Sequence, residues 1–222
     1  MGPVLEVAHN TAKSKENGGR SESGQTLVEF AMVIPMVVVL LMALLELALG
    51  LNASLAVNRA SQHGAHMASS GGNILGTDCL ILEKVEADLS VPNDPSRISE
   101  VVIERTALVG NLSYAQQRWG RYGQTDCVKP DGTTVKLPYT LAINGYPESQ
   151  RCTVLGGCPS LSPPRSTVDN IGVIVRYTHQ WVTPLNGALD LISPDGGTSG
   201  GGGGSSGWSF EQRNIFRIEP TL

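Results

Sequence analysis

The 222-residue sequence lacks the residue patterns on which many enzymes and metal sites depend. It contains no His-Glu-x-x-His motif, no Gly-x-Ser-x-Gly motif and no Gly-rich phosphate loop between a strand and a helix. Its cysteines do not form Cys-x-x-Cys pairs, and His63 and His66 have no third ligand in view. These absences argue against an enzyme, a bound cofactor and a metal site.

The sequence also lacks an excess of basic residues. It has 16 Lys and Arg against 20 Asp and Glu, which gives a formal net charge of −4. Surfaces that bind nucleic acids depend on clustered positive charge to neutralise phosphates. We therefore expect no nucleic-acid partner.

Long hydrophobic runs are absent except for one near the N-terminus. Residues 30–45 are apolar almost without interruption. A helix crosses the bilayer core, about 30 Å thick, with about 20 residues, and residues 27–51 reach that length. Pro35 lies inside this run, and membrane helices tolerate proline better than soluble helices do. The sequence predicts a transmembrane helix at residues 25–51 and an extracytoplasmic domain at residues 52–222.

Basic residues are distributed unevenly around the apolar run. Lys13, Lys15 and Arg20 precede it, whereas Arg59 alone follows it closely. Because Lys and Arg are enriched on the cytoplasmic side of membrane helices, we expect a cytoplasmic N-terminus. The remainder of the chain would then lie on the other side of the cell membrane, anchored by a single pass.

The four cysteines, Cys79, Cys127, Cys152 and Cys158, all lie after the apolar run. An even number of cysteines in an oxidising compartment predicts two disulfides. Cys152 and Cys158 flank a Gly-Gly turn and form the easiest local pair, but the sequence leaves all three pairings open.

Two carboxylates border the apolar run, Glu29 at its start and Glu46 near its end. A charge within a bilayer is costly and usually faces a partner. The positive end of the helix dipole would favour Glu29 at the cytoplasmic edge, where it could be an ordinary charge at headgroup level. Glu46 follows 17 residues later, about 25 Å along a helix, which places it near the outer interface.

Gly24 gives Glu29 a second interpretation. If the chain were cut after Gly24, Gln25 would carry a free amine and Glu29 would be the fifth residue of the new chain. Such an amine, with a pKa of about 8, is mostly protonated at neutral pH. It could neutralise Glu29 within one chain or pair with Glu29 of a neighbouring helix. The second arrangement would fix the axial register of a helix bundle.

The segment Gly24-Gln-Thr-Leu-Val-Glu29-Phe30 resembles the cleavage site of type IV-like prepilins. Within that class, residues 24–68 resemble the TadE-like proteins, which are minor pseudopilins of the tight-adherence (Flp) pilus system. A weaker resemblance returns at residues 170–222. The positions that match the family pattern also include Pro35, Glu46, Asn58-Arg59-Ala60 and Gly64-Ala65.

The resemblance implies that a prepilin peptidase cuts between Gly24 and Gln25, so that residues 1–24 are a cytoplasmic leader. It also assigns Glu29, Phe30 and Glu46 to helix registration and assembly. The implied function is structural, in pilus assembly or adhesion. The implied partners are the lipid bilayer, the peptidase and other pilins or pseudopilins, and the protein would lie in the membrane or in the pilus.

Two other functions are compatible with the sequence. One is a single-pass membrane-anchored binding module that does not assemble, and the other is a secreted disulfide domain released by signal peptidase. The mature N-terminus separates the three hypotheses. It would be Gln25 for a pseudopilin, the intact N-terminus for the anchored module, and a residue between 50 and 57 for the secreted domain.

The sequence after the membrane helix predicts an α+β fold, a long N-terminal helix with a small antiparallel sheet. A stripe of small residues continues the helix until Gly71-Gly72 ends it. This stripe suits close packing, either against another helix or against the chain's own domain. It consists of Ala53, Ala56, Ala60, Gly64 and Ala68.

The rest of the domain is predicted from local patterns. Residues 79–89 have helical periodicity, with Thr77 or Asp78 as the N-cap. Residues 111–165 are rich in Gly, Pro and Ser and predict long loops, held by disulfides and anchored by Trp119 and Tyr122. Three segments predict strands, and the Gly/Ser-rich loop 196–207 would join the last two as an antiparallel hairpin. The strand segments are residues 97–108, 169–182 and 208–220.

Overall fold

The computed structural model describes residues 22–90, 93–106, 113–154, 158, 167–182 and 207–218. The chain divides into two compact units, Met1–Ala43 and Leu44–Leu222, each described by itself below. The helices are α1 (Glu22–Gly71) and α2 (Thr77–Asp88), with short 3-10 helices η1 (Pro95–Arg97) and η2 (Glu148–Gln150). The strands are β1 (Ile98–Thr106), β2 (Ser113–Gly120), β3 (Thr125–Val128), β4 (Thr134–Leu137), β5 (Thr140–Asn144), β6 (Asn170–Gln180) and β7 (Gly207–Arg217).

The long N-terminal helix is confirmed. α1 has 50 residues and contains Pro35 without interruption. From Thr26 onwards it is long and apolar enough to cross a membrane. It ends at Gly71, as expected, because Gly72 adopts a positive φ of 55° that glycine accepts readily.

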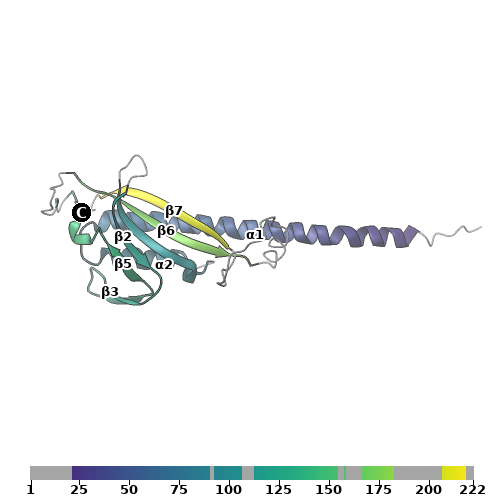
Figure 1. Ribbon diagram of the computed structural model, residues 1–222, viewed down its shortest axis with the longest axis horizontal. Coiled ribbons are helices and arrows are strands. Elements are labelled where there is room, and N and C mark those ends of the chain that lie inside the picture. Colours follow the sequence, from purple (N-terminus) through teal and green to yellow (C-terminus); the bar gives the residue numbers. More distant parts are fainter. Residues whose placement is uncertain are drawn as a thin grey trace, which may run out of the picture. The chain divides into compact units, whose positions relative to one another are not determined.

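The second unit contains a five-stranded sheet in the order β5-β2-β1-β6-β7, and all its neighbouring strands are antiparallel. The three predicted strands are confirmed as β1, β6 and β7. β6 and β7 lie side by side (Figure 1) and pair along their whole length, from Asn170 opposite Arg217 to Gln180 opposite Gly207. The predicted hairpin is therefore confirmed, although residues 196–206 of the Gly/Ser-rich loop lie outside the described residues. The fold is of the α+β class.

The prediction of long loops at residues 111–165 was wrong, because β2, β3, β4 and β5 lie there. β2 has a polar sequence, but it pairs with β1 on one side and β5 on the other. Such pairing overrides a weak local propensity for strand formation. Trp119 does pack in the core, with 7% of its surface exposed, whereas Tyr122 is 73% exposed and is no anchor.

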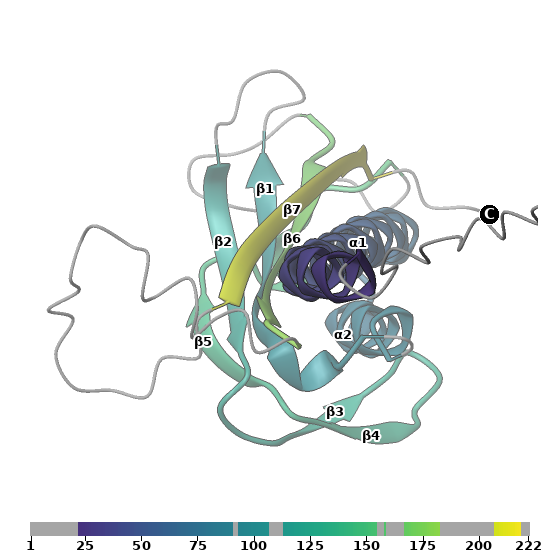
Figure 2. The ribbon, with the colours of Figure 1, turned by 90° about the vertical axis from the view of Figure 1, so that its right-hand side faces the viewer.

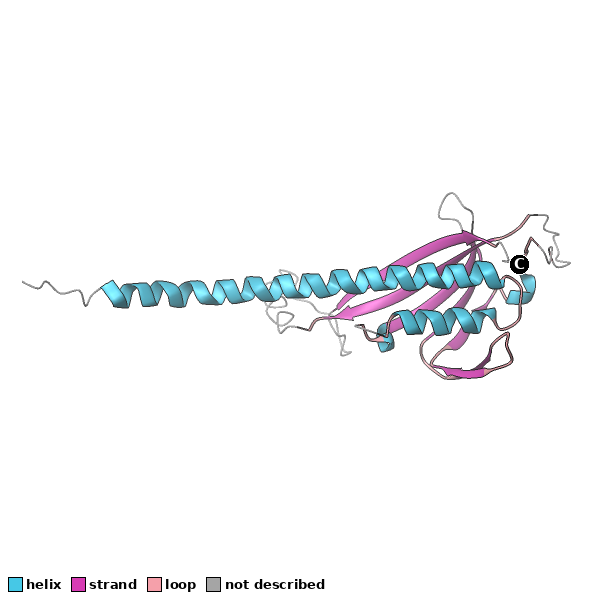
Figure 3. Cartoon of the chain, turned by 180° about the vertical axis from the view of Figure 1, so that it is seen from behind, coloured by secondary structure: helices cyan, strands magenta, loops and turns pink. Residues whose placement is uncertain are grey.

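The core lies between one face of the sheet and two helices (Figure 2). The C-terminal part of α1 runs beside α2 (Figure 3), and the small stripe of α1 is buried in this layer except for Ala56, which is partly buried. At Gly64, an added β-carbon would lie 3.2 Å from both Val173 Cγ1 and Val85 Cγ2. Near it, Ser61 donates a hydrogen bond to the Val173 carbonyl oxygen at 2.7 Å. The stripe therefore packs against the chain's own domain, which decides between the two alternatives.

The N-cap prediction for α2 was wrong. The residue before the helix is Gly76 (φ 89°), and neither Thr77 nor Asp78 caps the helix with its side chain. Instead, Glu148 accepts the N–H groups of Gly76 and Asp78 at 2.9 and 2.5 Å. Burial raises the pKa of Glu148, and the nearby charge of Asp78 raises it further. The cap comes from a distant segment, so the local sequence carries no signal for it.

Two disulfides are present, between Cys79 and Cys127 and between Cys152 and Cys158. The second is the local pair that the sequence favoured. The first joins the start of α2 to β3, so that the β3–β4 hairpin is fixed beside α2 (Figure 2). Because its two cysteines are 48 positions apart in the sequence, this disulfide removes much of the freedom of the unfolded chain.

Candidate functional site

The first unit presents an apolar helix surface. The side chains of residues 26–41 are all exposed there, including Phe30 at 66%, Met36 at 74% and Leu40 at 57%. An apolar surface of this extent is unfavourable in water and marks a region that lipid or another protein covers. This surface has the character of a membrane-spanning helix.

The expected processing site lies at the start of this surface. Gly24 and Gln25 are in the first turn of α1, and Glu29 and Phe30 follow about one turn later with exposed side chains. Residues 1–21 of the expected leader lie outside the described residues. Cleavage itself stays a prediction. The helix nevertheless places the backbone of Gln25 about one turn from Glu29.

Glu46 has partners inside its own chain. The carboxylate is 1% exposed and lies in the second unit, against the end of β6. The ring of His179 contacts it, with Nε2 of His179 3.1 Å from Oε1 of Glu46. The backbone N–H of Val182 also donates to both carboxylate oxygens, at 3.1 and 3.2 Å. The Glu46 carboxylate is therefore held by the strand end that packs on α1.

These contacts give Glu46 a role that the sequence did not predict. Its expected role was registration with another helix, and that role stays a prediction. In the structure the carboxylate fastens the end of β6 to α1 and satisfies a buried histidine and a backbone donor. A partner helix would have to displace these contacts in order to bind the same carboxylate.

Two tryptophans from the ends of β6 and β7 lie near Gly50 of α1, about one helical turn after Glu46. Trp208, at the start of β7, packs on Gly50 so closely that an added β-carbon would lie 2.8 Å from its ring. Trp181, just after β6, makes an edge-to-face contact with Trp208, with ring centroids 5.1 Å apart. Gly50 therefore leaves room on α1 for an aromatic pair at the end of the β6–β7 hairpin.

Sequence reasoning missed His179, although its position carried a signal. Alternation along β6 places His179 on the same face as Val173, Val175 and Tyr177, which are buried. A polar residue that continues such a buried row needs a buried partner. Glu46 is that partner on α1.

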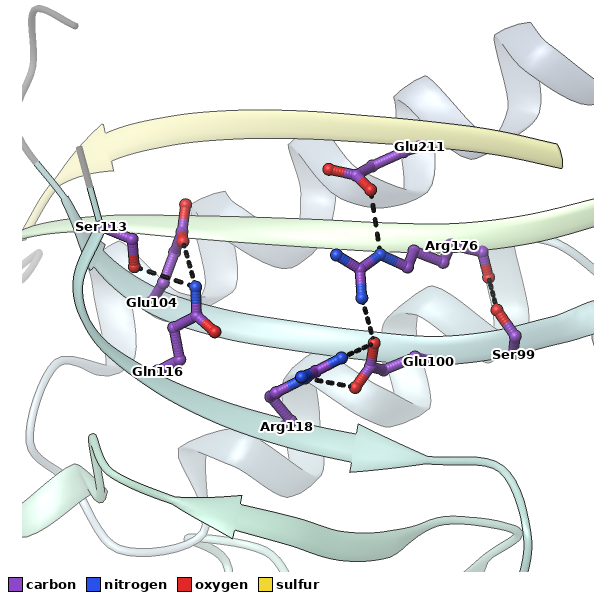
Figure 4. Close-up of polar contacts among 8 residues, drawn as sticks. All are labelled: Ser99, Glu100, Glu104, Ser113, Gln116, Arg118, Arg176 and Glu211. Carbon is purple, nitrogen blue, oxygen red and sulfur yellow. Dashed lines mark hydrogen bonds and ion pairs between the residues drawn. The ribbon is translucent and has the colours of Figure 1, made fainter. Parts of the chain in front are cut away.

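The opposite face of the sheet carries a ladder of ion pairs (Figure 4). Glu100 on β1 binds Arg118 on β2 at 2.6 Å and also pairs with Arg176 on β6, which in turn binds Glu211 on β7 at 2.9 Å. Burial would raise the pKa of Glu100, but its hydrogen bonds and ion pairs with the two arginines outweigh that effect and lower the pKa. Because the charges satisfy one another across four strands, we interpret this face as structural.

The two histidines that the sequence offered as metal ligands make other contacts. His63 Nδ1 lies 2.7 Å from a carboxylate oxygen of Asp88, and the His66 ring contacts Phe216. Within the described ranges, no group of three His, Cys, Asp or Glu side chains is placed to hold a metal ion.

Comparison with known proteins yields one match. No curated protein and no solved structure matches the chain. The matching family model covers residues 24–66, which begin at the expected cleavage site and follow α1 through most of its buried stripe. These residues match the family of TadE-like proteins, as the resemblance predicted.

Proposed function

We propose that this chain is a TadE-like pseudopilin, a membrane-anchored structural component of a tight-adherence (Flp) pilus system. The observation that carries the proposal is the family match at residues 24–66, which includes the exposed apolar surface at residues 26–41 of α1. In this proposal α1 crosses the cell membrane and the second unit lies outside the cytoplasm. The protein contributes to pilus assembly or adhesion, with the exposed apolar surface of α1 as its contact with neighbouring helices.

Processing prepares the helix for assembly. A prepilin peptidase cuts after Gly24, which leaves Gln25 with a protonated amine at the membrane edge. The carboxylate of Glu29 lies four residues further on, about 6 Å along the helix axis. Amine and carboxylate of neighbouring subunits attract each other strongly where water is scarce. When neighbouring helices pack through their apolar surfaces, this attraction favours the one axial offset at which the amine of one subunit meets the Glu29 carboxylate of the next.

Glu29→Val is expected to impair incorporation into pili without preventing cleavage after Gly24. The substitution removes the partner of the Gln25 amine, and a charge-assisted hydrogen bond contributes about 1.5–3 kcal/mol, roughly tenfold or more in association. The measurement compares the amount of variant in sheared pili with the amount in the membrane, and N-terminal sequencing reports cleavage.

A matched control is Glu83→Val, which removes a partly exposed carboxylate of α2 that pairs with Lys129 at 3.4 Å. It should leave incorporation near the unsubstituted level. Normal incorporation of the Glu29→Val protein would reject the registration role. An unsubstituted chain that stays uncut in the membrane would instead favour an anchored binding module.

A further inference from the structure

Within the second unit, the turns of α1 around Glu46 are covered on one side and exposed on the others. Glu46 is 1% exposed and Gly50 is buried, because the ends of β6 and β7 cover that side of the helix. The apolar residues around them remain uncovered. They are Leu44, Leu45, Leu47 and Leu51, each between 46 and 57% exposed.

The strand ends that cover Glu46 add apolar and aromatic surface at the same level. Val182 is 63% exposed and Trp208 is 38% exposed, and Trp181 packs edge-to-face on Trp208. The third tryptophan of the chain, Trp119, is only 7% exposed and belongs to the core. Two of three tryptophans therefore gather where the apolar run of α1 ends.

The chemistry of this surface matches lipid. Residues 44–51 continue the apolar sequence that precedes them, and four of their leucines remain exposed in the second unit. Tryptophan prefers the boundary between headgroups and acyl chains, where one end of the indole is apolar and the other hydrated. A carboxylate exposed at that depth would be costly. His179 and the Val182 N–H offset that cost by binding Glu46.

We propose that one end of the second unit, where β6 ends and β7 begins, lies in the outer headgroup layer of the bilayer, with Trp181 and Trp208 as anchors. The strand ends then shield Glu46 on one side of α1, while lipid covers the leucines on the other sides. This inference rests on the proposed function only in requiring that α1 spans a membrane.

The test uses the full chain in phosphatidylcholine vesicles that contain no other pilus protein. Three variants keep a single tryptophan each: W119F/W181F keeps Trp208, W119F/W208F keeps Trp181, and W181F/W208F keeps Trp119. Lipids brominated either near the headgroup or near the end of the acyl chain quench nearby indoles. We expect loss of emission from Trp181 and Trp208, more with the shallow bromines, and none from Trp119.

The outcomes separate this proposal from the proposed function. A chain that floats with the vesicles but keeps the emission of Trp181 and Trp208 overturns the lipid contact and leaves the membrane anchor intact. Stronger quenching by the deep bromines overturns the headgroup placement. A second copy that covers this end would also keep both indoles unquenched. A chain that does not float contradicts the membrane-anchored function itself.

Substitution of the tryptophans can disturb folding, so the unsubstituted chain is measured beside the variants. Its tryptophan emission should fall only in part, because the emission from Trp119 is retained. The loss should again be greater with the shallow bromines than with the deep ones. An unsubstituted chain that floats and retains its full emission overturns the proposal whatever the variants do.

Discussion

Glu46→Ala is expected to lower the free energy of unfolding of the second unit by about 3 kcal/mol. The substitution leaves the buried His179 ring and the Val182 N–H without the carboxylate that they contact at 3.1 Å. It also frees the end of β6 from α1. The measurement is a urea titration of the full chain in detergent micelles, followed by circular dichroism.

The matched control is Glu29→Ala on the same helix, because Glu29 is exposed and its loss should change the free energy of unfolding by less than about 0.5 kcal/mol. Glu46→Gln should cost less than Glu46→Ala, since an amide oxygen still accepts from Val182. Unchanged unfolding together with weaker association between copies would contradict this account. That result would place the partner of Glu46 in another helix.

Arg151→Met is expected to lower the free energy of unfolding by about 3–5 kcal/mol, which is typical for breaking a buried ion pair. Arg151 is 0% exposed and donates to Asp78 at 2.5 Å and to Gln117 Oε1 at 3.3 Å. Its guanidinium also lies over the ring of Tyr146. Methionine fills much of the same space but leaves the Asp78 carboxylate without its cation. The same urea titration measures the effect.

Arg176→Met is the control for the buried position. Arg176 pairs with both Glu100 and Glu211, but its side chain is 36% exposed on the open face of the sheet. Surface ion pairs contribute about 0–1 kcal/mol, so the control should cost much less than Arg151→Met despite its two ion pairs. Equal costs for the two variants would show that burial is not what makes Arg151 important.

The elements that the sequence predicted are those whose pattern is local. The apolar run and small stripe predicted α1, and the patterns at residues 169–182 and 208–220 predicted β6 and β7. β2 was missed because its polar sequence becomes a strand only by pairing with β1 and β5. Long-range pairing of this kind leaves no local pattern to read.

The candidate site likewise contains residues that the sequence reveals and partners that only the fold brings near them. Glu29 and Glu46 stand out in the sequence because a carboxylate beside a membrane-spanning run is costly unless it has a partner. The partner of Glu46 does not stand out, because His179 is 133 residues away and is brought near only by the packing of β6 on α1. Glu148 caps α2 from 70 or more residues away for the same reason.

The central claim is that α1 is a processed prepilin-type helix, and the mature N-terminus tests it most directly. The measurement is N-terminal sequencing of the protein purified from its native membrane, with the prepilin peptidase present. The account predicts a chain that starts at Gln25. A chain with its N-terminus intact would contradict the account, and Glu29 would then be an ordinary charge at headgroup level.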